Sequence, residues 1–186
     1  MADLLQFLQH IDKAVFYWVN THLANSYLDY IMVWVTRKQN WYFPGGVLWV
    51  LLMWKGGKKG RFLGLLVIAG IILADQISSS ILKPFVGRLR PCKVLDDFRL
   101  LVHCGGKYSF PSSHASNIAA IGTLFIGFYR KWMPIWVILI FVIGISRIYV
   151  GVHYPFDVLG GWLLGVMIGW LLITFSRRWG FLEDQL

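Results

Sequence analysis

Residues 156–175 read FDVLGGWLLGVMIGWLLITF, and Asp157 is the only charged side chain among them. An α-helix rises 1.5 Å per residue, so about 20 apolar residues are needed to cross roughly 30 Å of hydrocarbon. Similar apolar runs cover residues 133–150, about 113–129, and 62–82. Of the 186 residues 57% are hydrophobic, and the mean hydropathy is +0.59, which is unusual for a soluble domain. These features predict an all-α integral membrane protein.

Two further segments are less regular. Residues 41–54 are apolar but contain Pro44, Gly45 and Gly46, which can kink a helix or delay its start. Residues 14–36 carry polar side chains in their middle, so they form either one interrupted span or an interfacial helix followed by a short one. We expect a bundle of about six transmembrane helices. Residues 1–186 would form a single membrane domain, with a core at 62–175 and one sizeable loop at 83–110.

The charge distribution suggests a partner and a topology. Lys and Arg number 18 against nine Asp and Glu, but no basic helix or aromatic–basic RNA module is visible, so we expect anionic lipid rather than nucleic acid as a partner. Short loops rich in Lys and Arg usually stay cytoplasmic. If every span crosses, residues 55–61, 130–131 and 177–178 share that side, although the total count of basic residues is the same on both sides. The loop 83–110 and the stretch 146–157 then lie on the external face.

Both cysteines of the chain, Cys92 and Cys104, fall in the loop 83–110. A disulfide between them would contribute about 2–4 kcal/mol and would require an oxidising compartment. Two free thiols are the alternative. A zinc site that includes His103 is less favoured, because four ligands at ordinary spacing are absent.

Three polar clusters flank the apolar runs on the predicted external face. They are KPFVGRLRP (83–91), PSSH (111–114) and SRIYVGVHYPFD (146–157). The cations Lys83, Arg90 and Arg147 suit a group with two negative charges, since arginine can bind phosphate oxygens through two parallel hydrogen bonds. Ser112 and Ser113 stand at a predicted helix start, where hydroxyl and backbone N–H groups can point at the same anion. Together the clusters predict a phosphate-binding site.

Two histidines are the candidate reactive groups. Asp157 falls in the first turn of a helix that Pro155 begins, close enough to accept the N–H of one ring nitrogen of His153. That contact would fix the tautomer and make the other nitrogen a better nucleophile. His114 would then be the proton donor. Taken singly, each of these residues has a structural alternative, such as a cation reaching the headgroups or a hydrogen-bonded histidine.

The three clusters resemble the type 2 phosphatidic acid phosphatase superfamily. Its pattern is Lys, six residues, Arg-Pro; then Pro-Ser-Gly-His; then Ser-Arg, five residues, His, three residues, Asp. This chain has the same residues at the same spacing, except that Ser113 replaces the glycine. The backbone N–H is expected to be the group needed there, so a small residue should be acceptable.

The resemblance implies a metal-independent lipid phosphate phosphatase without a cofactor or an obligatory protein partner. It implies that His153 forms a phosphohistidine, that Asp157 orients it, and that His114 protonates the leaving group. The phosphate would be bound by Lys83, Arg90, Ser112, Ser113 and Arg147. Two histidines in opposite protonation states predict a bell-shaped pH dependence.

Candidate substrates that the family implies are lipid A 1-phosphate, undecaprenyl diphosphate and phosphatidylglycerol phosphate. The extra cations of the loop favour the first two, with their polyanionic headgroups: Arg88, Lys93, Arg99 and Lys107. The expected location is the bacterial inner membrane, with the active site facing the periplasm. A lipid phosphotransferase and a lipid-anion transporter without chemistry are the alternatives.

One acidic side chain lies within a predicted span. Asp75 would be penalised by about 2.5–3.5 kcal/mol at the bilayer centre. We therefore expect it to face the bundle interior, in a structural polar network with neighbouring Gln76 and residues 78–80.

Overall fold

The fold is built from helices, as the sequence predicts. The computed structural model describes residues 2–178, and within that range no strand forms beyond one isolated bridge between Leu89 and Tyr108. The α-helices are α1 (Ala2–Tyr17), α2 (Ser26–Thr36), α3 (Gln39–Lys55), α4 (Gly57–Gln76), α5 (Lys83–Val86), α6 (Pro91–Val94), α7 (Ser113–Phe128), α8 (Met133–Tyr149) and α9 (Pro155–Arg178). Tighter or wider turns extend them at η1 (Trp18–His22), η2 (Ile77–Leu82) and η3 (Arg130–Trp132).

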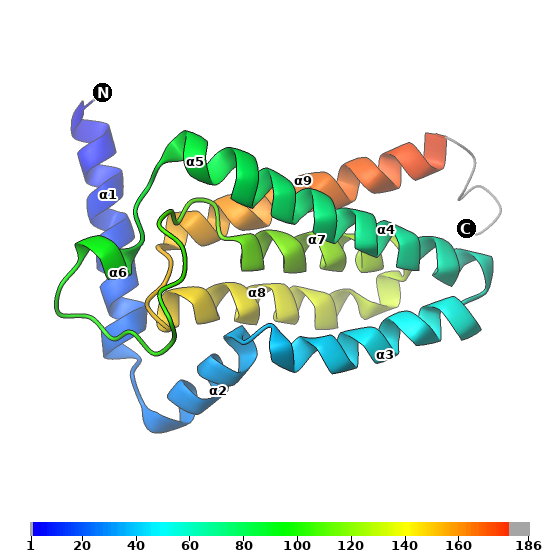
Figure 1. The fold of residues 1–186 in the computed structure, drawn as a ribbon, viewed down its shortest axis with the longest axis horizontal. Coiled ribbons are helices and arrows are strands. Elements are labelled where there is room, and N and C mark those ends of the chain that lie inside the picture. Colours follow the sequence, from blue (N-terminus) through cyan, green and yellow to red (C-terminus); the bar gives the residue numbers. More distant parts are fainter. Residues whose placement is uncertain (1, 179–186) are drawn as a thin grey trace.

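Helix α7 is the interior helix of the bundle. Figure 1 shows α3, α4, α7, α8 and α9 running side by side along the long axis of the molecule. Helix α7 contacts α4, α8 and α9, and most of its buried positions carry small side chains. Small side chains let helix backbones approach closely, which is a common basis for helix association in membranes.

The closest approach joins α7 to α9 through three glycines at i, i+4 and i+8. A Cβ added at Gly161 would lie 2.5 Å from the carbonyl oxygen of Ser112, and one at Gly165 would lie 2.2 Å from that of Ser116. One at Gly169 would lie 2.7 Å from Cβ of Thr123. No side chain fits at these positions, so the two helices touch backbone to backbone.

Three helical segments of the described chain are long and apolar enough to cross a membrane: Gly57–Val86, Arg130–Tyr149 and Pro155–Arg178. They include the predicted spans 62–82, 133–150 and 156–175, apart from Val150. The predicted spans at 113–129 and 41–54 correspond to the shorter helices α7 and α3, and α3 is continuous through Pro44. The count of about six spans therefore stays a prediction.

The expectation for Asp75 is wrong. Ala74 and Ser78, one turn apart, point into the bundle, whereas Asp75 is exposed. Successive helical residues are turned by about 100°, so the neighbour of an inward residue points elsewhere. Asp75 therefore lies outside the packed interior.

The N-terminal segment is broken rather than continuous. Helix α1 runs across the end of the bundle, and α2 follows as a short separate helix (Figure 1). The break ends at Asn25, whose side chain caps α2 by accepting a hydrogen bond from the backbone N–H of Leu28 at 2.9 Å. On α1, Asp12 and Phe16 are buried, while Leu5 and Phe7 are exposed. Helix α1 therefore packs one face against the bundle and exposes apolar side chains on another, and because it spans Ala2–Tyr17 it is not one half of a single 14–36 span.

The loop between α5 and α7 covers the same end of the bundle as α1. Cys92 and Cys104 are bonded to each other within it. The side chain of Asn20 fixes the loop to α8, since its amide donates to the carbonyl oxygens of Arg99 and Tyr149 at 2.8 and 2.7 Å. Its own oxygen accepts from the backbone N–H of Arg99. The loop is thus held by a covalent link and by the N-terminal helices.

Candidate active site

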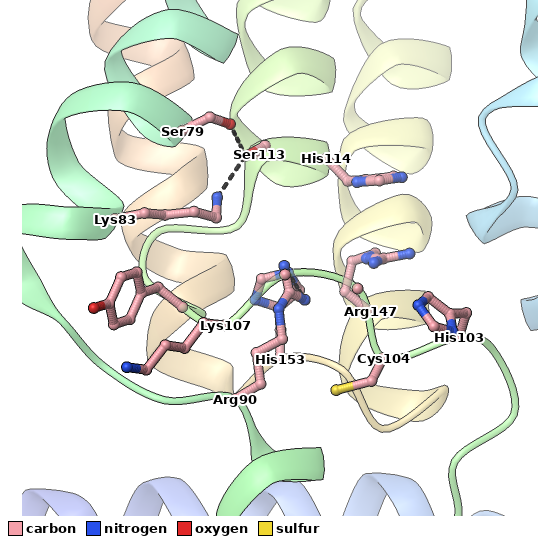
Figure 2. A pocket seen from close by; sticks show the side chains of 13 residues that line it. Ser79, Lys83, Arg90, His103, Cys104, Lys107, Ser113, His114, Arg147 and His153 are labelled. Carbon is pink, nitrogen blue, oxygen red and sulfur yellow. Dashed lines mark hydrogen bonds between the residues drawn. The ribbon is translucent and has the colours of Figure 1, made fainter.

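A cavity of about 410 Å³ opens at the end of the bundle that the loop covers. Its lining comes from η2 and α5, the loop, α7, the end of α8 and the turn before α9 (Figure 2). The residues that line it are Ser79, Lys83, Arg90, His103, Cys104, Gly105, Gly106, Lys107, Tyr108, Ser113, His114, Arg147 and His153. The three sequence clusters, separated by up to 70 positions, therefore meet in one cavity.

The three predicted cations are each held by a separate contact. Nζ of Lys83 donates to the carbonyl oxygen of Pro111 at 2.8 Å and to the hydroxyl of Ser113 at 2.6 Å. Nη1 of Arg90 lies 3.1 Å from the carbonyl oxygen of Val152. Arg147 donates to the hydroxyl of Thr36 at the end of α2. These contacts fix the positive groups before any ligand arrives.

The wall of the cavity is positively charged. Lys83, Arg90, Lys107 and Arg147 line it, and none of the described residues that line it is Asp or Glu. Within residues 2–178, Nε of Arg90 and Nε of Arg147 are buried donors without a hydrogen-bond partner. Buried charged donors are normally paired, so this arrangement favours an anion with several oxygen acceptors.

His153 is positioned by the turn between α8 and α9. The backbone N–H groups of Val152 and His153 both donate to the carbonyl oxygen of Arg147, at 3.2 Å each. Gly151 has a φ of +86°, and a Cβ there would lie 2.4 Å from the carbonyl oxygen of Arg99. Only glycine suits that position. The turn therefore ties the placement of His153 to that of Arg147.

The contacts of His153 define its tautomer. Nε2 lies 3.1 Å from Nη1 of Arg90, and a guanidinium can only donate, so Nε2 carries the lone pair. The proton is then on Nδ1, which lies 3.4 Å from Oδ2 of Asp157, beyond the usual hydrogen-bond range. Burial, followed by the charges of Arg147 and Arg90, holds the pKa of His153 well below its usual value. His153 is thus a neutral imidazole with its lone pair next to the cationic cavity.

His114 lies on the first turn of α7 and also lines the cavity. The start of α7 is tied to α9, because the backbone N–H of Ser112 donates to the carbonyl oxygen of Asp157 at 2.8 Å. The two histidines are thereby carried on segments that are bonded to each other. Both face the same cavity.

Two of the predicted site residues lie behind the cavity rather than on its wall. Asp157 is buried beneath His153, and Ser112 is buried with no hydrogen-bond partner for its hydroxyl among the described residues. Ser113 does more than offer a backbone N–H. Its hydroxyl bonds Lys83 and lies 3.1 Å from the hydroxyl of Ser79 (Figure 2). It also accepts a hydrogen bond from the hydroxyl of Ser78 at 3.0 Å.

The extra loop cations have different surroundings. Lys107 lines the cavity. Arg99 instead pairs with Asp29 on α2, and Arg88 pairs with Asp12 and Asp157. Neither arginine is part of the cavity wall, and Lys93 is not part of it either, so of the four only Lys107 is placed to add positive charge there.

Several residues near the site belong to none of the three sequence clusters. Thr36 and Asp12 are far in sequence from the clusters, and their contacts with arginines depend on how α1 and α2 pack. One signal was available for Asp12, since it shares a helix face with the apolar Phe16 and Val19 at i, i+4 and i+7. Within the described part of the chain, no group of three or more His, Cys, Asp or Glu is placed to hold a metal ion.

Comparisons with known proteins agree with this geometry. The sequence profile of the PAP2 superfamily matches residues 64–181. A lipid A 4'-phosphatase of Bacteroides thetaiotaomicron is 32% identical over 94% of this chain and 81% of its own length. An undecaprenyl-diphosphatase of Sulfolobus acidocaldarius is 30% identical over 80% of this chain and 71% of its own.

A solved structure has the same fold. The crystal structure of a transmembrane PAP2-type phosphatidylglycerolphosphate phosphatase from Bacillus subtilis aligns with a TM-score of 0.73 and 25% identity, over 92% of this chain and 87% of that one. The profile match covers all three clusters and the helices that carry them. The chain therefore belongs to the PAP2 superfamily.

Proposed function

We propose that the protein is an integral membrane phosphatase that hydrolyses the phosphomonoester or diphosphate of a lipid through a phosphohistidine intermediate. The observation that carries this proposal is the cavity in which His114 and His153 meet Lys83, Arg90 and Arg147, with no Asp or Glu among the described residues that line it. Dispersed positive charge suits phosphoryl transfer, where the enzyme mainly positions the group and stabilises its equatorial oxygens. The apolar chains of the substrate remain in the bilayer.

In the first step, Nε2 of His153 attacks phosphorus and the bond from phosphorus to the leaving oxygen breaks. His114, protonated in the complex with the anionic substrate, gives that oxygen a proton. Arg90 exchanges its contact with Nε2 for a phosphoryl oxygen, which frees the lone pair for attack. Asp157 compensates the positive charge that develops on the imidazole.

In the second step, water attacks the phosphorus of the phosphohistidine. His114, now neutral, takes a proton from the water, and the bond between nitrogen and phosphorus breaks. Inorganic phosphate leaves, and His153 returns to its neutral form. No step requires a metal ion, because Lys83, Arg90 and Arg147 supply the positive charge.

Lipid A phosphates and undecaprenyl diphosphate are the substrates we place first, with phosphatidylglycerol phosphate third. Relatives with each of these three activities align with most of the chain. Lys107 adds a fourth cation to the cavity wall, which favours a headgroup with more than one phosphate. The 4'-phosphate of lipid A joins the 1-phosphate as a candidate, because the lipid A phosphatase relative acts on that position.

We further propose that residues 1–186 act as one domain of multi-pass type in the inner membrane, with the cavity open to the periplasm. The bond between Cys92 and Cys104, beside the cavity, supports the oxidising side of the membrane. The basic segments 55–61 and 130–131 lie at the other end of the bundle, as the positive-inside rule requires for this orientation (Figure 1).

The proposal is tested by incubating purified protein with lipid A, undecaprenyl diphosphate and phosphatidylglycerol phosphate and measuring free phosphate. We expect release from at least one lipid by the wild type and by His10→Ala, an exposed histidine on α1, but none above background by His153→Ala. Equal release by wild type and His153→Ala would remove His153 from the mechanism. Loss of substrate without free phosphate would indicate transfer to another hydroxyl.

The intermediate is tested separately. A lipid labelled with ³²P at the transferred phosphate is mixed with enzyme and the reaction is stopped with alkali. We expect protein-bound label that survives alkali and is lost in acid, as a phosphohistidine is, and we expect no such label on His153→Ala. Label that is stable in acid would contradict a histidine nucleophile.

A further inference from the structure

Arg88 bridges two buried carboxylates from opposite ends of the sequence. Its Nη1 donates to Oδ1 of Asp157 at 2.9 Å, and its Nη2 donates to Oδ2 of Asp12 on α1. The side chains of Asp12 and Asp157 are 0% exposed, and that of Arg88 is 26% exposed. Buried charges are costly unless they are paired, so this triad is a defined unit rather than a surface contact.

The position of Arg88 is fixed from a third direction. Its guanidinium lies over the ring of Tyr154, 4.2 Å from the ring centroid. Asp12 is fixed as well, because its Oδ1 accepts the backbone N–H of Phe156 at 2.8 Å. Both oxygens of Asp12 are therefore occupied, one by the arginine and one by the first turn of α9.

The same turn carries the group that faces His153. Oδ2 of Asp157 accepts the backbone N–H of Tyr154 at 2.8 Å and lies 3.4 Å from Nδ1 of His153. Oδ1 of Asp157 is occupied by Arg88. The orientation of the carboxylate toward the imidazole is thus set by donors that include Tyr154 and Arg88, and Arg88 is itself anchored by α1.

We propose that Asp12 and Arg88 are positioning residues for the reaction at His153: Arg88 holds Asp157 in its orientation, and Asp12 holds Arg88. This inference rests on the proposed function, since it assigns the two residues a part in the nucleophilic step. Two carboxylates share one guanidinium, which leaves one net negative charge beneath His153. That charge matches the positive charge the imidazole acquires when it bonds to phosphorus.

The electrostatics of Asp12 are consistent with this arrangement. Burial raises the pKa of Asp12, and the hydrogen bond from Arg88 opposes that rise. Removing Arg88 would leave two buried carboxylates without their counter-ion, whereas neutralising Asp12 would leave Arg88 with Asp157 alone. In the second case the full arginine charge would act on Asp157 and reduce the negative charge available to the imidazole.

The test compares Asp12→Asn, Arg88→Lys and Arg88→Met with the wild type on the same three lipids, measuring kcat and KM. Asp12→Asn keeps the size of the side chain and its bond to Phe156. We expect its kcat to fall about tenfold and its KM to stay within threefold, because neither residue lines the cavity. Arg88→Met should lose at least a hundredfold in kcat, and Arg88→Lys should recover part of that loss.

A matched control is the pair of Asp29 and Arg99, which also ties an N-terminal helix to the loop but contacts neither His153 nor Asp157. Asp29→Asn should lower the thermal midpoint about as much as Asp12→Asn while kcat stays within twofold of wild type. An Asp12→Asn enzyme with wild-type kcat, or with no greater loss than Asp29→Asn, would overturn the inference.

Two additions to the experiment distinguish failure of the inference from misfolding of a variant and from failure of the proposed function. If Arg88→Met does not fold, Arg88→Lys and Asp12→Asn still decide the question. Histidine-selective ¹⁵N spectra give a readout without substrate: we expect the Nδ1–H tautomer of His153 in the wild type and a mixture of tautomers in Arg88→Lys, and an unchanged tautomer would count against the inference. A wild type that releases no phosphate from any lipid, with His153 as predicted in these spectra, would refute the proposed function instead.

Discussion

The ammonium group of Lys83 lies 2.6 Å from the hydroxyl oxygen of Ser113, at the position where the family pattern has glycine. Its other contact is the carbonyl oxygen of Pro111 at 2.8 Å, which leaves the third N–H for a phosphate oxygen. The side chain at the one departure from the pattern therefore positions Lys83, the cation that we propose binds phosphate.

Replacing Ser113 by glycine should lower kcat/KM at least tenfold on the preferred lipid. The hydrogen bond that is lost comes from the charged ammonium of Lys83, and a hydrogen bond to a charged group contributes about 1.5–3 kcal/mol. Lys83→Met should cost at least a hundredfold, because it removes a charge from the phosphate. Ser80→Ala is the control, since Ser80 is exposed and bonds Gln76, and it should stay within twofold. A Ser113→Gly enzyme as active as wild type would mean that the hydroxyl does not place Lys83.

The role of His114 can be separated from that of His153 by the choice of leaving group. His114→Ala should slow release of a lipid alkoxide by about 10² to 10⁴, the usual range for a general acid. The burst of p-nitrophenolate from p-nitrophenyl phosphate should slow less than tenfold, because that group leaves without a proton. Equal slowing of both reactions would show that His114 is not the proton donor.

Most of the residues predicted from the three clusters line the cavity, although Ser112 and Asp157 lie behind it. They come together because each cluster ends or begins a long apolar helix. Helix ends on one side of a membrane are confined to one layer, so position along the chain becomes position in space. The same reasoning could not place Asp12 or Thr36. Their partners are side chains on other helices, and which face of α1 or α2 packs inward depends on tertiary contacts. The expectation for Asp75 failed for a related reason. The free-energy cost of a carboxylate in hydrocarbon predicts that the side chain avoids lipid, but it does not predict which residues of the helix face inward.

The acid limb of the pH profile should lie below the ordinary histidine value. Burial and the charges of Arg147 and Arg90 hold the pKa of His153 well below 6.5, so its imidazole stays neutral and nucleophilic as the pH falls through that value. Arg90→Met removes one of these charges, and the limb should move upward. Because both enzymes are assayed on the same lipid, ionisation of the substrate cancels in the difference. A limb that Arg90→Met leaves in place would contradict a buried neutral nucleophile.

The free energy of unfolding should depend on pH in the same direction. The unfolded chain takes up a proton on His153 near pH 6.5, whereas the native protein takes it up only at lower pH. The contribution of this group to stability is therefore fully present above that value and is lost as the pH falls below it. Thermal unfolding of the wild type and of His153→Ala between pH 4 and 8 would show it, as a steeper decline in the wild type.

Gly165→Ala should destabilise the protein and lower its activity, because the added Cβ would lie 2.2 Å from the carbonyl oxygen of Ser116 on α7. Overpacking of this kind typically costs about 1–3 kcal/mol. Gly46→Ala on α3 is the control, since no atom lies within 4 Å of the added Cβ, and an exposed helical glycine gains up to about 1 kcal/mol as alanine. Thermal midpoints in detergent measure both. A Gly165→Ala protein as stable as Gly46→Ala would show that α7 and α9 are not in backbone contact.

The three glycines that bring α9 against α7 divide the positions of α9 into two groups: those that form the contact and must be kept, and those that face outward and can change. The contact depends on these glycines and on the small α7 residues that face them, but on no other side chain of α9, so substitutions elsewhere on α9 leave the distance between the site residues of the two helices unchanged. The outward-facing positions of α9, such as Leu163, Met167 and Leu171, are exposed and take no part in that contact. They can drift to suit bilayers of different thickness or composition while the reaction geometry is inherited intact.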